Sequence, residues 1–131
     1  MGVTTYIKGA ILIEPPIPWD VCKDSDWIAR QGDHSPLELK LRIAELPVNT
    51  AEGVLIRRHA DAVVGRWEDE PRAEYAVQEL QEIIDEFGDG RVFTGRLDME
   101  CRDFMEQWRL KVVGGKATRF DPVTVWPEGS E

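Results

Sequence analysis

A strict alternation of apolar and charged residues between Leu37 and Ile43 is the feature that most constrains the fold of this chain. The run reads LELKLRI, so its leucine and isoleucine side chains fall on one face of an extended backbone and its charged side chains fall on the other. This period of two residues predicts a half-buried β-strand, with one face in a core and the other in solvent.

The same alternation recurs along the chain and predicts further strands. Gly114-Gly115 separates two of them and suits the two-residue loop of a β-hairpin. The segment from Leu46 to Asn49 contains a proline and is expected to end the strand that begins at Leu37. Arg58 interrupts the apolar parity of another strand, which indicates a bulge or an edge. We therefore expect an antiparallel sheet of five or six strands, at residues 5–13, 37–43, 53–64, 93–101, 107–113 and 116–120.

One long helix is predicted over residues 71–87. Pro71 suits the first helical position, and Gly88 suits the cap that follows the last turn. The apolar residues between them fall within an arc of about 120° when successive residues are placed about 100° apart, so they form a stripe that must pack on another element. We therefore expect an α+β fold, in which the sheet carries this long helix on one face and residues 1–131 form a single globular domain.

The proline-rich segment EPPIPWDV, residues 14–21, is interpreted as a corner between a strand and a short helix. Pro15 cannot donate a ladder hydrogen bond and is expected to end the first strand. Pro18 suits the first turn of a short N-terminal helix over Trp19 to Lys23. A docking tag for a proline-binding domain is the alternative, but such tags lie on extended, mobile segments rather than between two core elements.

Composition and charge exclude some classes of partner. The formal net charge is -9, from 25 acidic and 16 basic residues, which argues against general affinity for nucleic acid or for an anionic membrane. The apolar run from Ala10 to Ile13 is far shorter than the about 20 residues that span a bilayer, and no secretory cleavage pattern accompanies it. We expect a cytoplasmic protein with reduced cysteines.

Several short motifs together resemble a known family. EPPIPW followed by a short helix ending in KDS, the segment FTGRLDMECRDFMEQWRLKVVGGK and the final VTVWPEG are similar to an uncharacterised family of small proteins from actinobacteria and their phages. That family is a domain of unknown function, so the resemblance implies no catalytic residues. It does imply an accessory protein of phage or actinobacterial origin.

Residues with catalytic or metal-binding chemistry are few and poorly grouped. His59 precedes Asp61 by two residues on a polar strand face, an arrangement that can orient an imidazole as a base or hold a metal, but a solvated face is the simpler interpretation. The set Cys22, His34, His59 and Cys101 lacks the close spacing of zinc sites. No glycine motif has the register of a phosphate-binding loop. We therefore expect no catalytic residue, no metal site and no cofactor.

The polar face of the sheet is a candidate ligand site. If the apolar faces of all strands point to one core, basic residues gather on the opposite face, where Arg57, His59, Arg96 and Arg109 are candidates to bind an anionic ligand. The alternative is a solvated face in which these residues pair with neighbouring carboxylates.

The exposed side of the long helix is a candidate protein-binding surface. It is acidic, and Tyr75, Glu79 and Glu82 are the residues there that we expect to contact a partner. A row of carboxylates on a helix can also imitate the phosphates of DNA and occupy a DNA-binding protein.

From these observations we expect a non-enzymatic accessory or protein-interaction protein, phage-related, whose partner is another protein such as a host factor. Two alternatives stay open: a binder of small anionic ligands that uses the basic sheet face, and a DNA-mimic inhibitor that uses the acidic helix. The sequence leaves the oligomeric state undecided.

Overall fold

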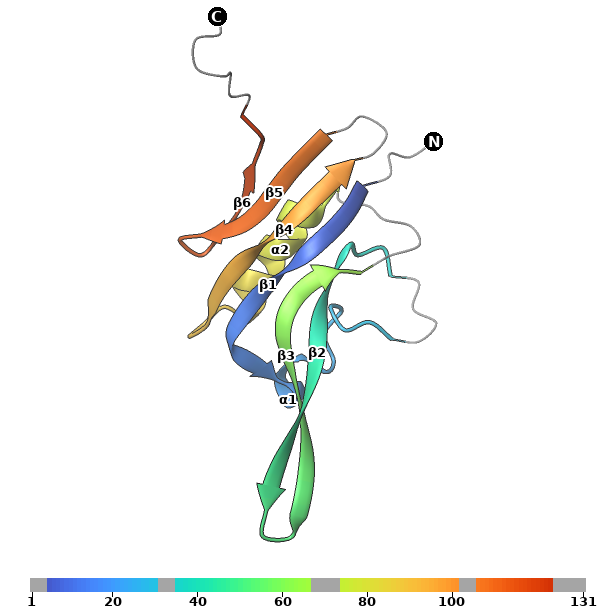
Figure 1. The fold of residues 1–131 in the computed structure, drawn as a ribbon, viewed down its shortest axis with the longest axis vertical. Coiled ribbons are helices and arrows are strands. Elements are labelled where there is room, and N and C mark those ends of the chain that lie inside the picture. The colour runs from blue at the N-terminus through green and yellow to red at the C-terminus, as the bar shows by residue number, and fades with distance from the viewer. Residues whose placement is uncertain (1–4, 31–34, 67–73, 102–105, 124–131) are drawn as a thin grey trace, which may run out of the picture.

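The computed structural model describes residues 5–30, 35–66, 74–101 and 106–123. Its main element is a six-stranded antiparallel sheet with the strand order β2-β3-β1-β4-β5-β6, so β2 and β6 are the edge strands (Figure 1). Two short helices among the described residues accompany the sheet. The elements are β1 Thr5–Pro18, α1 Trp19–Cys22, β2 Leu39–Thr50, β3 Gly53–Gly65, α2 Ala76–Phe87, β4 Val92–Cys101, β5 Glu106–Val113 and β6 Lys116–Phe120.

The expected α+β fold with one long helix packed on one face of the sheet is wrong. The protein is mostly antiparallel sheet, and the described helices are the four-residue α1 and the twelve-residue α2. Tyr75 has φ -109° and ψ 12°, and the backbone N–H groups of Glu74 and Tyr75 donate to the Glu38 carboxylate of the segment entering β2. These bonds hold the chain out of the helix until Ala76. The expected helix start at Pro71 lies outside the described residues, whereas the antiparallel strands and the short N-terminal helix are confirmed.

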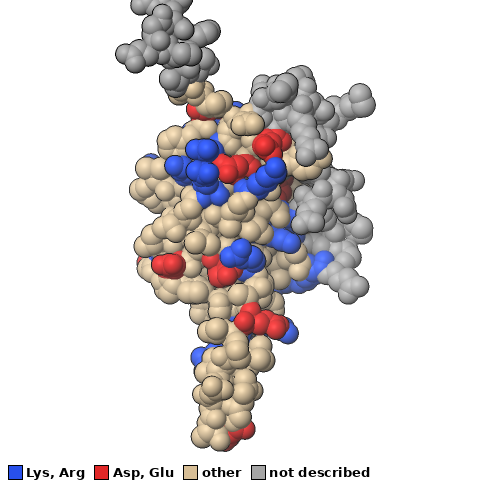
Figure 2. Space-filling model, in the orientation of Figure 1, with Lys and Arg blue, Asp and Glu red and all other residues tan. Residues whose placement is uncertain are grey.

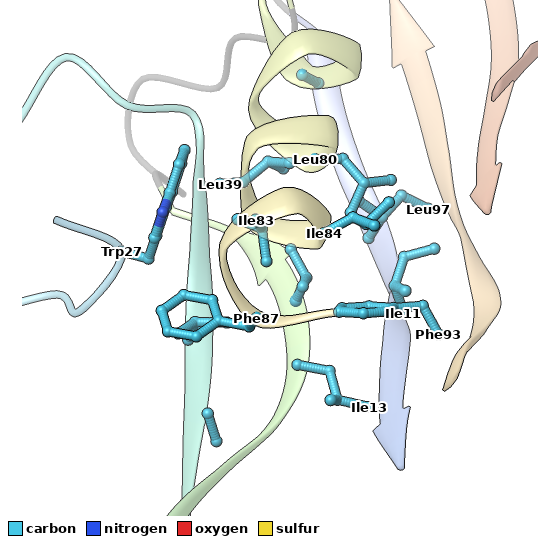
Figure 3. Close-up of a cluster of buried hydrophobic side chains, with 14 of the residues drawn as sticks. Ile11, Ile13, Trp27, Leu39, Leu80, Ile83, Ile84, Phe87, Phe93 and Leu97 are labelled. Atoms are coloured by element: carbon cyan, nitrogen blue, oxygen red, sulfur yellow. The ribbon is translucent and has the colours of Figure 1, made fainter. Parts of the chain in front are cut away.

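Buried side chains from the sheet and from α2 form a hydrophobic cluster (Figure 3). Leu39 and Leu41 of the LELKLRI run are 0% and 2% exposed, while the next residue, Arg42, reaches solvent, so the half-buried strand predicted from this run is confirmed from Leu39 onward. Leu80 and Ile83 bring the buried side of α2 into the same cluster. Complete burial of each such aliphatic side chain contributes about 1.5–3 kcal/mol.

A carboxylate from α2 joins the helix to the start of β2. Glu79 is 5% exposed, and its Oε1 accepts hydrogen bonds from the backbone N–H groups of Glu38 at 2.8 Å and of Leu39 at 2.9 Å. Arg66, 6% exposed, donates from Nε to the Leu39 carbonyl and from Nη2 to the Asp26 carbonyl. Polar groups at the beginning of β2 are thereby satisfied inside the protein, where water cannot replace these partners.

Strand β1 does not end at Pro15 as expected. It continues to Pro18, but its ladder with β3 is interrupted between Leu12, which lies opposite Ala62, and Ile17, which lies opposite Ala60. Prolines cannot donate to a ladder, so the two strands separate around the prolines and resume pairing beyond them. Asp61 is the residue of β3 that faces this opening.

Two glycines let β1 and β4 approach closely on either side of the Ala10–Arg96 pair. Gly95 has φ +94°, and a Cβ atom there would lie 2.7 Å from the Ala10 carbonyl oxygen; Gly9 has φ +88° and a similar contact with the Arg96 carbonyl oxygen. These contacts are with backbone atoms of a paired strand, which cannot move without breaking the ladder.

Replacing Gly95 with alanine is expected to lower the free energy of unfolding by about 3 kcal/mol, from backbone strain together with the clash. Gly115 is the matched control, because its φ of +78° is similar but no atom lies within 4 Å of the added Cβ position. Gly115→Ala should cost only about 1 kcal/mol. Urea denaturation of the two variants measures the difference, and equal losses would contradict the close approach of β1 and β4.

Candidate functional site

Strands β2 and β3 extend beyond the rest of the sheet as a two-stranded hairpin, which we call the hairpin arm and define as residues 45–58 (Figure 1). Its register runs from Glu45 opposite Arg58 to Thr50 opposite Gly53, with a two-residue loop between them. The expected strand end between Leu46 and Asn49 is therefore wrong. Pro47 is tolerated within β2 because β2 is an edge strand, on which an N–H directed outward needs no partner from the sheet.

The arm stands alone because the neighbouring strand ends at its root. Pro18 lies opposite His59 in the last pair between β1 and β3, and α1 begins at the next residue, Trp19. From Arg58 to Gly53, β2 is the only described strand that pairs with β3. A two-stranded ribbon has no second layer over either face, so its side chains on both faces remain open to solvent.

Large apolar side chains cover the arm. Leu46 is 53% exposed, Val54 61%, Leu55 52% and Ile56 57%. Between Leu46 and Ile56 the single charged residue is Glu52, although 31% of the whole chain is charged. Figure 2 shows the arm as a nearly uncharged projection below a body that carries charges of both signs. A contiguous apolar surface of this kind is typical of a protein-interaction site.

An open pocket lies where β1 separates from β3. Its volume is about 800 Å³, and it is lined by Leu12, Ile13, Glu14, Pro15, Pro16, Asp61 and Val92. Leu12 is 41% exposed and Val92 62% exposed, so the pocket presents apolar surface. The pocket lies near the root of the arm, and the prolines that interrupt the β1–β3 ladder form one side of it.

The structure does not gather the four residues of the expected anionic-ligand site. Arg57 belongs to the hairpin arm and His59 to its root, where it lies opposite Pro18. Arg96 lies opposite Ala10, far from Pro18 along β1, and Arg109 lies on β5 beyond it. Strand order therefore separates the four into two pairs.

Several basic residues on the open face of the sheet form ion pairs with carboxylates. Arg96 and Arg109 both pair with Asp98, at 3.3 Å and 3.1 Å between nitrogen and oxygen. Other pairs on the sheet join Lys8 to Glu100 and Arg42 to Asp61. The hydrogen bonds that Arg42 donates to the Asp61 carboxylate raise the pKa of the Arg42 guanidinium. Figure 2 shows the resulting mixture of blue and red on this face. Charges paired in this way attract an external anion weakly.

Of the three residues expected to contact a partner through the helix, Glu79 is placed in the interior. Its side-chain oxygen accepts hydrogen bonds from the backbone N–H groups of Glu38 and Leu39. Burial raises the pKa of its carboxyl, although these two hydrogen bonds act in the opposite direction. Glu79 is thus unavailable to a partner. Tyr75 is 55% exposed just before α2, and Glu82 is exposed and accepts a hydrogen bond from Gln78.

Within the described part of the chain, no group of three or more His, Cys, Asp or Glu side chains is arranged to hold a metal ion. Cys22 is a buried free thiol, and burial raises its pKa above the ordinary value. His34 and the Cys101 side chain, which completed the set considered from the sequence, lie outside the described part. Among the described helices, none is both long enough and apolar enough to cross a membrane.

Comparison with known proteins gives a family match without a functional match. No curated protein and no solved structure matches this chain. A model for a family of unknown function matches residues 1–131, so membership of an uncharacterised family, as the sequence motifs indicated, is confirmed. The chain belongs to the family of unknown function DUF6205.

Proposed function

We propose that this protein is a protein-interaction module that docks onto another polypeptide through its hairpin arm. The observation that carries the proposal is the exposure of Leu46, Val54, Leu55 and Ile56 on a projection in which, within the described part of the chain, β2 and β3 pair only with each other. The arm replaces the acidic helix as our candidate surface, since Glu79 is buried.

The energetics of the arm support this proposal. Burying the exposed half of one such aliphatic side chain contributes about 1 kcal/mol, hence roughly 4 kcal/mol for the four residues together. An isolated two-stranded hairpin is at best marginally stable in water. A partner that covers the arm would add the missing layer and would remove apolar surface from solvent at the same time.

The sequence motifs EPPIPW and VTVWPEG support a setting for this module, as an accessory protein of phage or actinobacterial origin. In that setting the arm would engage a host factor or a component of the same genetic module. The contact surface in either case is apolar and not ionic, so binding should persist at high salt.

A photoreactive amino acid tests the proposal directly. With p-benzoylphenylalanine in place of Leu55, irradiation in cells or lysate is expected to give a covalent adduct with another polypeptide. The same amino acid in place of Val113 is the matched control, since Val113 is also 52% exposed but lies at the end of β5. Adducts at 113 as abundant as those at 55, or none at 55, would remove the support for the arm.

A further inference from the structure

We propose that the polypeptide bound by the hairpin arm is a second copy of this chain, and that the two copies pair the free edges of their β3 strands in antiparallel orientation. This inference rests on the proposed function of the arm, and it names the partner. The result would be a four-stranded sheet made of two arms, closed by two-fold symmetry.

The register of the arm shows which backbone groups are free to pair. Thr50 and Gly53 close a two-residue loop, and in such a hairpin the closing pair is hydrogen-bonded and the following pairs alternate. Val54, Ile56 and Arg58 therefore direct their N–H and C=O groups away from β2, along the outer edge of β3. Among the described strands, only β2 pairs with β3 over this stretch, and it occupies the other edge.

The two edges of the arm differ in how well they can accept another strand. On the β2 side the corresponding outward positions are Glu45, Pro47 and Asn49. Pro47 has no N–H, which is a common protection of an edge against pairing. The outer edge of β3 has no proline, so it can donate at each of its three outward positions and is the edge open to pairing.

The edge of β3 is complementary to itself when Ile56 of one copy lies opposite Ile56 of the other. Val54 then faces Arg58 of the second copy, and all three outward positions are paired in both chains. Arg58 keeps its ion pair with Glu45, at 3.1 Å. A register displaced so that Arg57 faced Arg57 would place like charges directly opposite, which is destabilising.

Charge placement also favours contact between two arms. The charged residues of the arm, Glu45, Glu52, Arg57 and Arg58, cancel, whereas the whole chain carries -9. In Figure 1 the arm extends away from the body of the sheet, where α2 lies with exposed carboxylates such as Glu82 and Asp85. Two copies joined by their arms therefore keep these acidic surfaces apart.

The test uses the purified full chain and the position at the proposed two-fold axis. Light scattering after gel filtration should give twice the chain mass of 14.9 kDa at concentrations where the arms associate. Ile56→Lys and Ile56→Glu should each raise the dimer Kd by about tenfold or more, because each places like charges opposite one another. A mixture of the two variants should recover the dimer to within about threefold of the wild-type Kd.

Pro47→Ala identifies the edge that is used. It adds an N–H to the β2 edge, so it should leave the Kd unchanged when pairing occurs through β3. Circular dichroism and the urea midpoint confirm that each variant is folded.

The inference is overturned by a wild-type chain that is monomeric at about 1 mM, by a mixture that stays monomeric, or by a dimer that Pro47→Ala strengthens. If the chain is monomeric but p-benzoylphenylalanine at position 55 still forms adducts with other polypeptides, this inference is wrong and the proposed function is supported.

Discussion

Replacing Glu79 with alanine is expected to lower the free energy of unfolding by about 2–4 kcal/mol, because two buried N–H groups lose their acceptor and each unsatisfied donor costs about 1–3 kcal/mol. The donors are the backbone N–H groups of Glu38 and Leu39, at 2.8 Å and 2.9 Å from Oε1. They lie at the beginning of β2, so their loss weakens the junction between α2 and the sheet. Urea denaturation measures the change.

Replacing Glu79 with glutamine tests the hydrogen-bond acceptor separately from the negative charge. Glu79→Gln keeps an oxygen in place of Oε1 and should change the free energy of unfolding by less than about 1 kcal/mol near pH 4. Burial raises the pKa of Glu79 in the folded protein above 4.5, the ordinary value of a glutamate side chain. As the pH rises from 4.5 through the folded pKa, the unfolded chain releases its proton first, and the wild type loses stability. The glutamine variant lacks this loss, so its stability relative to the wild type should increase with pH across that window.

Glu82 is the matched control on the same helix. Its side chain is exposed, so Glu82→Ala should alter the free energy of unfolding by no more than about 0.5 kcal/mol. An equal effect of alanine at positions 79 and 82, or a glutamine variant as unstable as the alanine variant, would show that the buried hydrogen bonds are not what joins α2 to β2.

The alternation of apolar and polar residues predicted most of the strands, because a strand that buries one face needs apolar side chains at every second position. The LELKLRI run forms strand β2 from Leu39 onward, with Leu39 and Leu41 buried, as its period of two indicates. The errors occurred at prolines: both Pro15 and Pro47 were expected to end strands, and both lie within them. Whether a proline is tolerated depends on a strand being at an edge or beside an opening in the ladder. That is a property of strand order, which local sequence does not contain.

The hairpin arm was missed for the same reason, although one signal pointed to it. The segment from Leu46 to Ile56 contains a single charged residue, whereas 31% of all residues in the chain are charged. A two-residue loop joins its two halves. A charge-poor segment of this length is expected in a core or in an interface. Once strand order shows that it is not in the core, the interface interpretation remains.

Long-range contacts explain where the helix start and the candidate site residues lie in the structure. The helix begins at Ala76 because Glu38, from a distant part of the sequence, binds the preceding N–H groups. The sequence placed Arg57 and His59 on the same face as Arg96 and Arg109. It could not show that the first pair lies at and beyond Pro18, the last residue of β1, whereas Arg96 lies opposite Ala10. The burial of Glu79 had a visible signal, since it lies three residues after Ala76 and four before Ile83, beside the apolar stripe.

Shortening the hairpin arm is expected to abolish protein association while leaving the fold intact. Residues 47–56 are replaced by Asn-Gly, which connects Leu46 to Arg57, a pair that the alternation makes hydrogen-bonded and so able to close a two-residue loop. The deleted side chains are mostly exposed, so the free energy of unfolding should change by less than about 1 kcal/mol. The core residues that hold β2 and β3 to the sheet lie outside the deletion.

The most direct measurement of the central claim compares the associations of the wild-type and shortened chains side by side. Both are isolated under identical conditions, and their molar mass and their covalent adducts in cell lysate are determined after chemical cross-linking. We predict that the shortened chain, with an unchanged circular dichroism spectrum, is monomeric and loses every adduct that the wild type forms. A folded, shortened chain that retains those associations would contradict binding through the arm. If a further Glu82→Lys substitution then removed them, the binding surface would be on α2.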